Sequence, residues 1–189
     1  MKKFALTLFA AAAATLSTGA MAQIYVSGDI GQGHSSIDCT GTDSCSKNDT
    51  AFKVTGGYKF GQGFSAELGY IDFGKLSFTD TSTGNAVSGD ISTHGITLGG
   101  LYELRLAPQI DGTARLGIAS VETKVSGAVA GVGSASQSET NTQLYYGLGL
   151  NYAVARNVKL EGGIDWSHGK FQGSSFVVRA ITVGGRYEF

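Results

Sequence analysis

The sequence predicts an all-β protein: an eight-stranded antiparallel up-and-down transmembrane β-barrel, preceded by a cleaved signal peptide. Three observations lead to this prediction. The N-terminus has the composition of a secretory leader, eight segments alternate between apolar and polar residues, and short connections between these segments alternate with long ones. Together they indicate a chain that is exported and crosses a membrane with strands.

Residues 1–22 have the features of a signal peptide. Two lysines follow the first methionine, residues 4–16 form an apolar stretch, and small residues around Ala22 suit a cleavage site. We therefore expect residues 23–189 to form a single barrel domain. No later segment approaches the ~18 consecutive apolar residues of a membrane-spanning helix, so strands must supply any membrane crossing.

The composition narrows the class of protein further. The formal net charge is −1, whereas nucleic-acid-binding proteins carry a basic excess on one face, so nucleic acid is not an expected partner. The chain has 29 glycines and one proline without a collagen-like period, and regular alternation around the glycines favours a closely packed sheet over disorder.

Eight segments alternate residue by residue, which is the period of a β-strand. One parity of each segment carries no charge, and the other parity holds nearly all of the charge. In chain order the segments are residues 24–31, 52–60, 64–71, 96–104, 110–118, 144–152, 158–166 and 181–189. Their uncharged parities begin, in the same order, with Ile24, Phe52, Phe64, Ile96, Ile110, Leu144, Val158 and Ile181. Each segment is therefore expected to be a strand with one apolar and one polar face.

The connections favour a membrane barrel over a soluble sandwich. Short turns follow the second, fourth and sixth segments, at residues 61–63, around Pro108 and around Asn157. The other connections are longer and polar, and we expect loops at residues 33–50, 74–92, 121–141 and 167–175. Outer-membrane barrels have such periplasmic turns and extracellular loops. The low-complexity residues 127–135 leave two alternatives open, a hairpin extended above the membrane or a mobile segment.

Aromatic residues gather near the strand ends, as in the interfacial girdles of membrane barrels. On the turn side they are Phe60, Phe64, Tyr102, Tyr152, Tyr187 and Phe189. Tyr70 and Trp166 lie on the loop side. The barrel must also close, because an open edge in hydrocarbon leaves backbone groups unpaired at several kcal/mol each.

If the apolar parity faces lipid, the charged parity lines the lumen. It contains five bases, Lys53, Lys59, Arg115, Lys159 and Arg186, and seven acids, Asp29, Glu67, Glu103, Asp111, Glu161, Asp165 and Glu188. Buried charges must pair, so we expect Asp29 beside Lys53 or Arg186, and Arg115 beside Glu67 or Glu161. The predicted lumen network comprises Asp29, Lys53, Glu67, Arg115, Glu161 and Arg186. Side chains just fill a barrel of eight strands, so a packed polar core is the first expectation and a narrow low-conductance pore is the alternative.

Two cysteines lie six residues apart in the first polar loop. In an exported chain, the oxidising periplasm is expected to join Cys39 to Cys45 in a disulfide.

Candidates for catalysis and metal binding are weak, so we expect no enzyme, cofactor or metal ion. His34 precedes Ser35 and Ser36, and Ser167 precedes His168, which leaves a lipid A-modifying enzyme as a second alternative. His94 is interpreted as a rim residue. The loop acids Asp38, Asp43, Asp49, Asp80 and Asp90 lack the spacing of a calcium loop.

Several segments resemble the small outer-membrane barrels related to the OmpA transmembrane domain, the OmpA-like and OmpX-like porin family. They are residues 24–28, 56–58, 67–74, 146–152 and 185–189. The resemblance implies an outer-membrane barrel with paired lumen charges, although Leu101 and Asn151 stand where relatives often carry charge. The final strand, with Tyr187 and Phe189, is similar to the signal that the outer-membrane assembly machinery recognises. Full-length relatives continue into a peptidoglycan-binding domain, whereas this sequence stops at Phe189, so wall anchoring is not expected.

These observations predict a protein of the Gram-negative outer membrane with an envelope-structural role. Its expected partners are outer-membrane lipid and lipopolysaccharide, the assembly machinery, and a surface or host ligand bound through the extracellular loops, because loops on rigid scaffolds commonly carry function.

Overall fold

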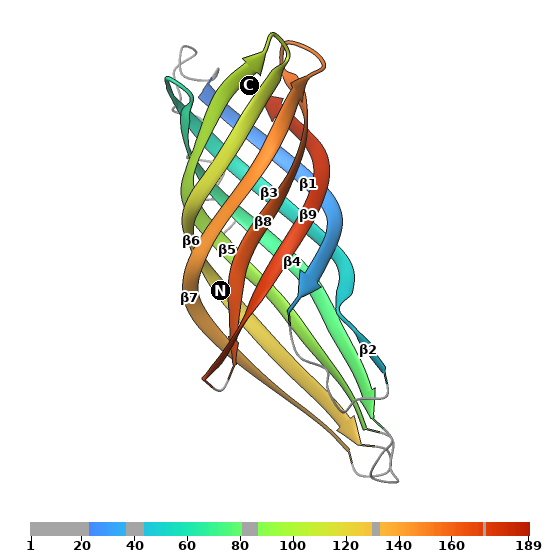
Figure 1. Cartoon of the computed structure of the whole chain (residues 1–189). Helices are drawn as coiled ribbons and strands as arrows, with labels where there is room; N and C mark the ends of the chain where they lie inside the picture. Colours follow the sequence, from blue (N-terminus) through green and yellow to red (C-terminus); the bar gives the residue numbers. More distant parts are fainter. Residues whose placement is uncertain (1–22, 37–43, 81–86, 130–132, 172) are drawn as a thin grey trace, which may run out of the picture.

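A computed structural model describes residues 23–36, 44–80, 87–129, 133–171 and 173–189. Figure 1 shows eight long strands wound obliquely around one axis, with one short strand at the side. The long strands are β1 (Ile24–Ser35), β3 (Asn48–Gly61), β4 (Phe64–Asp80), β5 (Val87–Ala107), β6 (Ile110–Val129), β7 (Gly133–Ala153), β8 (Val158–Phe171) and β9 (Ser174–Glu188), and the short one is β2 (Ser44–Ser46). All eight predicted segments lie within the long strands.

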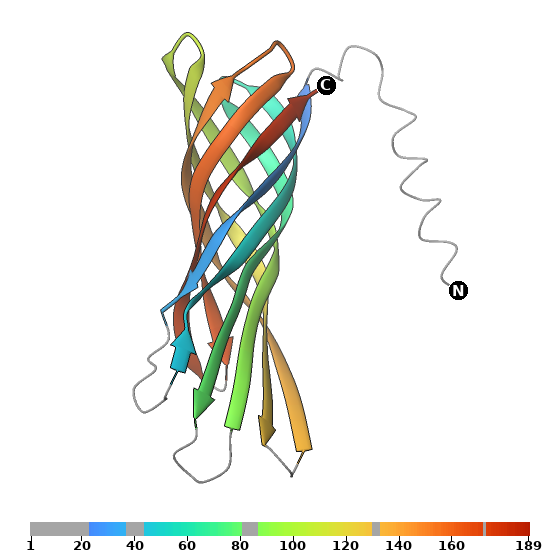
Figure 2. The same cartoon turned by 90° about the vertical axis from the view of Figure 1, so that its right-hand side faces the viewer.

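The long strands form a closed antiparallel barrel. Each one pairs with the next along the chain, and β1 pairs with both β3 and β9, so the first and last strands complete the cylinder. The short β2 pairs only with β4 among the described strands. Figure 2 shows the start of β1 and the end of β9 together at the end of the barrel that carries the short turns. The predicted eight-stranded up-and-down topology is confirmed.

The predicted orientation of the two alternating sets of side chains, apolar outward and charged inward, is also confirmed. The outward side chain of Val183 is 62% exposed, whereas the inward side chain of Arg115 is 6% exposed. Exposed apolar residues of the same kind cover all eight long strands, and the charged parity turns toward the barrel axis. Among the described residues, no helix is long and apolar enough to cross a membrane.

Aromatic pairs mark the two edges of the outward apolar band. Near the turns, the ring centroids of Phe64 and Tyr102 lie 4.8 Å apart. Toward the loops, Tyr146 and Trp166 stack at 5.5 Å with an interplanar angle of 16°. On β3 the band runs from Phe60 to Phe52, which matches the ~9–11 residues that a tilted strand needs to cross the hydrocarbon core.

The turn between β3 and β4 needs three residues in the left-handed region. Gly61, Gln62 and Gly63 have φ angles of 98°, 56° and 83°. Glycine adopts this conformation without steric cost, so the Gly-Gln-Gly sequence supplies two of the three positions cheaply. The predicted tight turn is therefore present.

The extent of the predicted loops was wrong. β4 continues to Asp80, β5 begins at Val87, and β6 and β7 pair as far as Val129 and Gly133. Most of the regions 74–92 and 121–141 is therefore strand, and residues 127–129 of the low-complexity segment pair with residues 133–135. Beyond the membrane both faces of a sheet meet water, so the apolar–polar alternation disappears although the backbone pairing continues. The loops expected at 33–50 and 167–175 are shortened in the same way by β1, β3, β8 and β9.

A β-bulge in β4 changes which parity faces inward. The pairing of β4 with β5 shifts between Asp72 and Lys75, and Gly74 has a φ of 83°. The Asp72 carboxylate accepts a 2.8 Å hydrogen bond from the Gly74 N–H. After the bulge the even-numbered Leu76 is buried, whereas before it the odd-numbered Ile71 is buried. A bulge inserts one extra residue into a strand, so the inward-facing positions change from odd-numbered to even-numbered residues.

Candidate functional site

The middle of the lumen is organised around Arg186 of β9. Its guanidinium lies 2.8 Å from a carboxylate oxygen of Glu161 on the adjacent strand β8. Across the lumen it lies 2.8 Å from Glu103 of β5 and 3.9 Å from Glu67 of β4. The side chain is fully buried, so these carboxylates replace the water that a free arginine would bind. One cation thus joins β9 to three other strands, β4, β5 and β8.

Arg115 of β6 connects to the same carboxylates. Its Nε donates a 3.0 Å hydrogen bond to Glu67, and Nη2 lies 3.8 Å from Glu161. The hydroxyl of Tyr25 also donates to Glu67, at 2.7 Å. Hydrogen bonds to charged groups are stronger than neutral ones, so this cluster fixes the relative positions of β1, β4, β6 and β8.

A second cluster lies closer to the loops. The Lys53 ammonium is 2.8 Å from Asp165 and 3.8 Å from Asp29. Tyr145 donates a 2.7 Å hydrogen bond to Asp165. The register places Asp29 directly opposite Lys53 on paired strands, but Lys53 and Asp165 meet across the lumen from β3 and β8.

A third cluster closes the turn end of the lumen. Lys59 contacts Glu188 at 2.6 Å, and Lys159 contacts Asp111 and Glu188 at 3.1 Å each. Arg105, at the rim, adds a 2.7 Å contact to Asp111. A cavity of about 640 Å³ opens between these residues and the turns. With this cluster, every one of the twelve charged residues predicted for the lumen has an oppositely charged neighbour.

Beside the second cluster and toward the loops, a group of apolar side chains packs together inside the lumen, and we call this group the plug. It consists of Ala51, Ile71, Phe73, Ala119, Val121, Tyr145, Val178 and Ala180, with Phe176 packed against it. Ile71 and Val178 are completely buried. Apolar side chains offer water no hydrogen-bond partners, although buried Ser35 and Ser167 lie directly opposite Val178. The plug therefore makes this level of the lumen less favourable for water.

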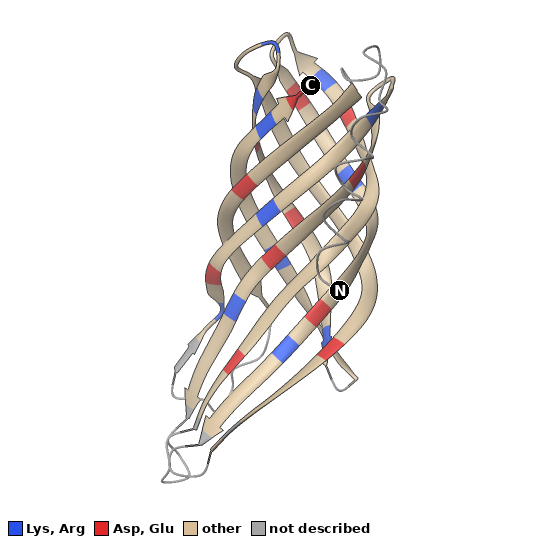
Figure 3. Ribbon diagram, turned by 180° about the vertical axis from the view of Figure 1, so that it is seen from behind, with Lys and Arg blue, Asp and Glu red and all other residues tan. Residues whose placement is uncertain are grey.

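The six residues of the predicted network all lie in the lumen, and the structure brings them into two adjacent clusters. Asp29 lies near Lys53 rather than Arg186, and Arg115 contacts both Glu67 and Glu161. Sequence reasoning did not single out Glu103, Asp165, Tyr25 or Tyr145, although the alternation had already placed the two acids inside. At the two positions where relatives often carry charge, Leu101 is buried and Asn151 donates a 2.9 Å hydrogen bond to Glu103. Figure 3 shows acidic and basic positions interleaved over the barrel strands.

The other predicted sites are placed as follows. Cys39 lies outside the described residues, and the backbone of Cys45 is in β2. The disulfide therefore stays a prediction. Tyr187 and Phe189 face outward at the end of β9 with ring centroids 4.9 Å apart, and the Phe189 N–H donates to the Ile24 carbonyl at 3.0 Å. The last strand is thus bound to the first up to its final residue.

Neither serine–histidine pair has the geometry of a nucleophile and its base. His34 Nδ1 lies 2.7 Å from the Asn48 amide oxygen, and the Ser36 hydroxyl donates to the Val177 carbonyl. Ser167 faces inward and donates to the Leu144 carbonyl, whereas the next residue, His168, faces the opposite side of the strand.

The rim histidine and those loop acids that the structure describes make contacts other than metal ligation. His94 lies 3.7 Å from Glu122 at the rim. Asp49 and Asp90 bind a backbone N–H and Ser77, and Asp38, Asp43 and the side chain of Asp80 lie outside the described residues. No group of three His, Cys, Asp or Glu residues within the described ranges is arranged to hold a metal ion.

Beyond the aromatic girdle, β4 to β7 continue as a sheet, which we call the outer sheet. Figure 1 shows these four strands reaching past the end of the β8–β9 hairpin. β7 pairs with β6 from Gly133 onward, but its pairing with β8 begins only at Tyr146. Between Gly133 and Tyr145, the other edge of β7 pairs with no described strand. The outer sheet therefore has a free polar edge outside the membrane.

Comparison with known proteins agrees with this architecture. The family model described as the outer membrane protein beta-barrel domain matches residues 4–189. Ail of Yersinia pestis, solved with the heparin analogue sucrose octasulfate, is 19% identical, with a TM-score of 0.57 and coverage of 87% of this chain and 99% of Ail. Neisserial surface protein A is 16% identical, with a TM-score of 0.58 and coverage of 88% and 97%.

OprG of Pseudomonas aeruginosa is 13% identical, with a TM-score of 0.57 and coverage of 89% and 96%. At these identities the likeness concerns the fold alone. A comparison with curated proteins gave no match. The match over nearly the whole sequence, together with the closed barrel and its outward apolar band, shows that the chain belongs to the outer membrane protein beta-barrel family and is an integral protein of the Gram-negative outer membrane.

Proposed function

We propose that this protein is a non-enzymatic envelope barrel whose outer sheet binds an extended polypeptide at the cell surface. The observation that carries the proposal is the free edge of β7 between Gly133 and Tyr145. An extended peptide can add to such an edge as a further strand, with backbone hydrogen bonds supplying the affinity. Natural proteins usually block free edges with lysine, proline or bulges, and this part of β7 contains no lysine and no proline.

The side chains on this edge support a polypeptide partner. Ser136, Gln137, Ser138 and Thr140 are exposed and present small hydroxyl and amide groups, which allow a second backbone to approach closely. On this side of β7 the Leu144 carbonyl accepts a hydrogen bond from Ser167, and no described strand pairs with the backbone of Ser136 or Ser138.

The charge of the outer sheet argues against a sulfated polyanion such as the one bound to Ail. The charged residues of the outer sheet whose side chains are described are the bases Lys75 and Lys124 and the acids Asp72, Asp90, Glu122 and Glu139. This acidic excess repels sulfate groups, whereas it neither attracts nor repels an uncharged peptide backbone.

The lumen favours a structural role over transport. Three ion clusters and the plug occupy the lumen of the barrel. A low-conductance pore would require water to pass through a layer of apolar side chains, which costs free energy at each step.

Adhesion of bacteria tests the proposal. A non-adherent Gram-negative strain that expresses the protein is applied to cultured epithelial cells, with and without prior protease or heparinase treatment of those cells. We expect adhesion above the empty-vector level that protease abolishes and heparinase leaves intact. The edge variant Ser136→Lys with Ser138→Lys should lose it, because lysine on an edge strand opposes further pairing.

The matched control is Ser88→Lys on β5, which is paired on both sides. Adhesion that persists in the edge variant, that is lost equally in the Ser88 variant, or that disappears with heparinase alone would contradict the proposal, as would the absence of adhesion.

A further inference from the structure

Five outward residues form a continuous row across five neighbouring strands on the loop side of the barrel. Each residue is the direct cross-strand partner of the next, which places their backbones about 5 Å apart. In order they are Tyr146 of β7, Trp166 of β8, Arg179 of β9, His34 of β1 and Asn48 of β3.

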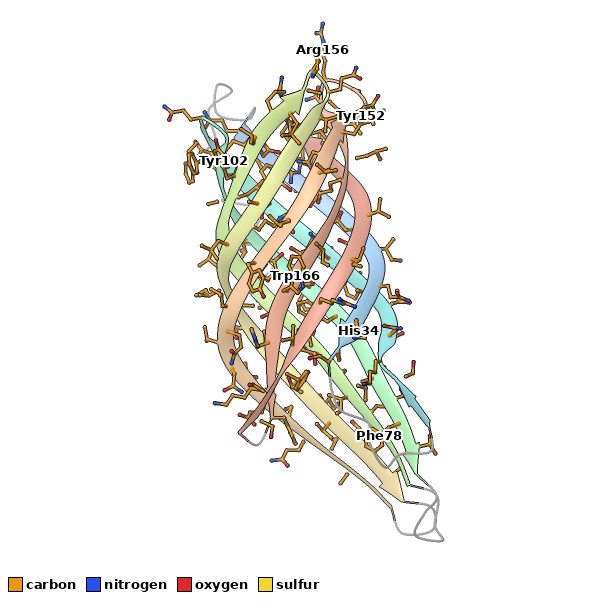
Figure 4. The ribbon with its side chains drawn as sticks, viewed as in Figure 1. His34, Phe78, Tyr102, Tyr152, Arg156 and Trp166 are labelled. Carbon is orange, nitrogen blue, oxygen red and sulfur yellow. The ribbon has the colours of Figure 1, made fainter. Side chains whose placement is uncertain are left out.

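The row rises from the apolar band into the polar zone above it, because the strands are tilted. Figure 4 shows Trp166 near the middle of the barrel and His34 farther toward the loop end. Since β9 lies between β8 and β1, Arg179 occupies the intermediate level. Ile181 lies on the same face of β9 as Arg179, two positions closer to the turns. It is 56% exposed and faces lipid. Arg179 therefore lies where hydrocarbon gives way to the headgroups of the outer leaflet.

Arg179 is a free cation among the described residues. Its side chain is exposed and makes no ion pair or hydrogen bond with any residue that the structure describes. This contrasts with the lumen, where each base contacts at least one carboxylate.

The charges on the two strands nearest to Arg179, β8 and β9, are of one sign at this level. Residues 166–180 contain Lys170, Arg179 and His168 but no acid, and Lys170 and His168 lie on the outward face of β8. At the level of the membrane surface, this face of the barrel is complementary to phosphate.

The aromatic end of the row gives the site a second property. Tyr146 and Trp166 stack nearly parallel, 5.5 Å apart, and Trp166 lies directly opposite Arg179. Stacked rings present an apolar surface with polar edges, which suits the sugar and the first methylene groups of a glycolipid.

We propose that Arg179, flanked by His34 and by the Tyr146–Trp166 stack, binds the phosphorylated sugar headgroup of an outer-leaflet glycolipid of the lipid A type. The guanidinium pairs with a phosphate in a bidentate arrangement, the His34 ring borders the phosphate on β1, and the sugar rests on the stacked rings. The site lies on the lipid-facing wall and is independent of the peptide-binding edge of β7.

The protein's single tryptophan provides a direct probe, because Trp166 is adjacent to Arg179. The refolded full chain in neutral detergent micelles is titrated with bisphosphorylated lipid A while the emission of Trp166 is followed. We expect a saturable change in emission. Dephosphorylated lipid A and phosphatidylglycerol should each bind at least tenfold more weakly, the first because it lacks the phosphate and the second because it lacks the sugar.

Arg179→Gln should raise the apparent dissociation constant for bisphosphorylated lipid A about tenfold, and Arg179→Lys should recover part of the loss. The matched control is Arg156→Gln, an exposed arginine at the turn end with no ion pair among the described residues, which should bind like the wild type. Heat-modifiable migration on a gel verifies that each variant is folded.

Three results would overturn the proposal. The first is that dephosphorylated lipid A binds as tightly as bisphosphorylated lipid A. The second is that phosphatidylglycerol binds as tightly, which would indicate attraction to any anionic surface. The third is that Arg179→Gln binds bisphosphorylated lipid A with unchanged affinity.

Discussion

The guanidinium of Arg186 lies over the ring of Tyr25, with Cζ 4.2 Å from the ring centroid. The hydroxyl of the same tyrosine donates to Glu67, which also approaches Arg186. A cation over an aromatic face is attracted by the ring, more strongly when both groups are desolvated. First and last strands are therefore joined inside the lumen as well as along their backbones.

Replacement of Arg186 by methionine should lower the free energy of unfolding by about 3–5 kcal/mol, because three carboxylates lose a buried partner. Urea titration of the refolded protein in lipid vesicles, followed by tryptophan emission, measures the change. Arg156→Met, at an exposed turn, should stay within about 0.5 kcal/mol of the wild type. Equal stability of the two variants would show that the ions do not hold the barrel together.

Gly57→Ala should destabilise the barrel by about 1–3 kcal/mol, because the new methyl group overpacks the lumen. A Cβ at Gly57 would lie 2.1 Å from Cζ of Tyr25. Gly56→Ala is the matched control, since a Cβ there meets nothing closer than 4.0 Å. Adding Tyr25→Ala should relieve the clash, so that a double-mutant cycle over Gly57 and Tyr25 gives a coupling free energy. Additive effects would contradict the close packing of this ring on β3.

The wild-type protein should show no open steps in planar lipid bilayers, because the ion clusters and the plug fill the lumen. Combining Ile71→Ala and Phe73→Ala in the plug with Glu67→Ala and Arg115→Ala in the network should produce them. Ile164→Ala with Val183→Ala, both on the lipid-facing side, serves as the control and should remain silent. Steps in the wild type that change with Arg115→Gln would favour the alternative of a low-conductance pore.

Cys39 and Cys45 should be joined in protein isolated from the outer membrane. Mass spectrometry of non-reduced peptides should recover the linked pair, and alkylation without reductant should modify neither thiol. For so short a loop, the chain-entropy estimate gives about 2 kcal/mol of stabilisation. Replacing both cysteines by serine should therefore leave heat-modifiable migration intact. Free thiols in the unreduced protein would refute the pairing.

The strand positions and faces were predictable because lipid enforces a strict rule. Every outward side chain in the band must be apolar, so Val183 and Arg115, on opposite parities, were assigned to opposite sides of the wall without knowledge of the packing. The neighbouring position of Asp29 and Lys53 followed from the pairing of consecutive strands.

The contacts across the lumen were not predictable in the same way. Lys53 and Asp165 belong to strands that are not paired, and their meeting at 2.8 Å depends on the stagger with which the barrel closes. Alternation carries no information about this stagger. The length of the hairpins was missed because Ser and Thr outside the membrane need not alternate, although Gly74 within β4 was a possible sign of the bulge.

The plug of apolar residues was only partly visible. Ile71 falls on the inward parity of a predicted strand. Val121 lies at the start of a predicted loop, and Phe73 and Val178 lie between a predicted strand and a predicted loop. Whether these residues face inward depends on the bulge in β4 and on the continuation of β6 and β9 beyond the membrane. Neither feature has a strong signal in the local sequence.

The placement of Arg186 on β9 has a consequence for biogenesis. The ribosome makes this strand after the other seven long strands, so Glu67, Glu103 and Glu161 are all synthesised before the cation that neutralises them. A partly assembled sheet without β9 would leave these carboxylates without their shared guanidinium, at a cost in free energy if they were buried. The final strand brings Arg186 to Glu67, Glu103 and Glu161, and it brings Glu188 to Lys59 and Lys159. Closure therefore leaves the net charge of the lumen unchanged but completes the ion pairs that allow these groups to be buried.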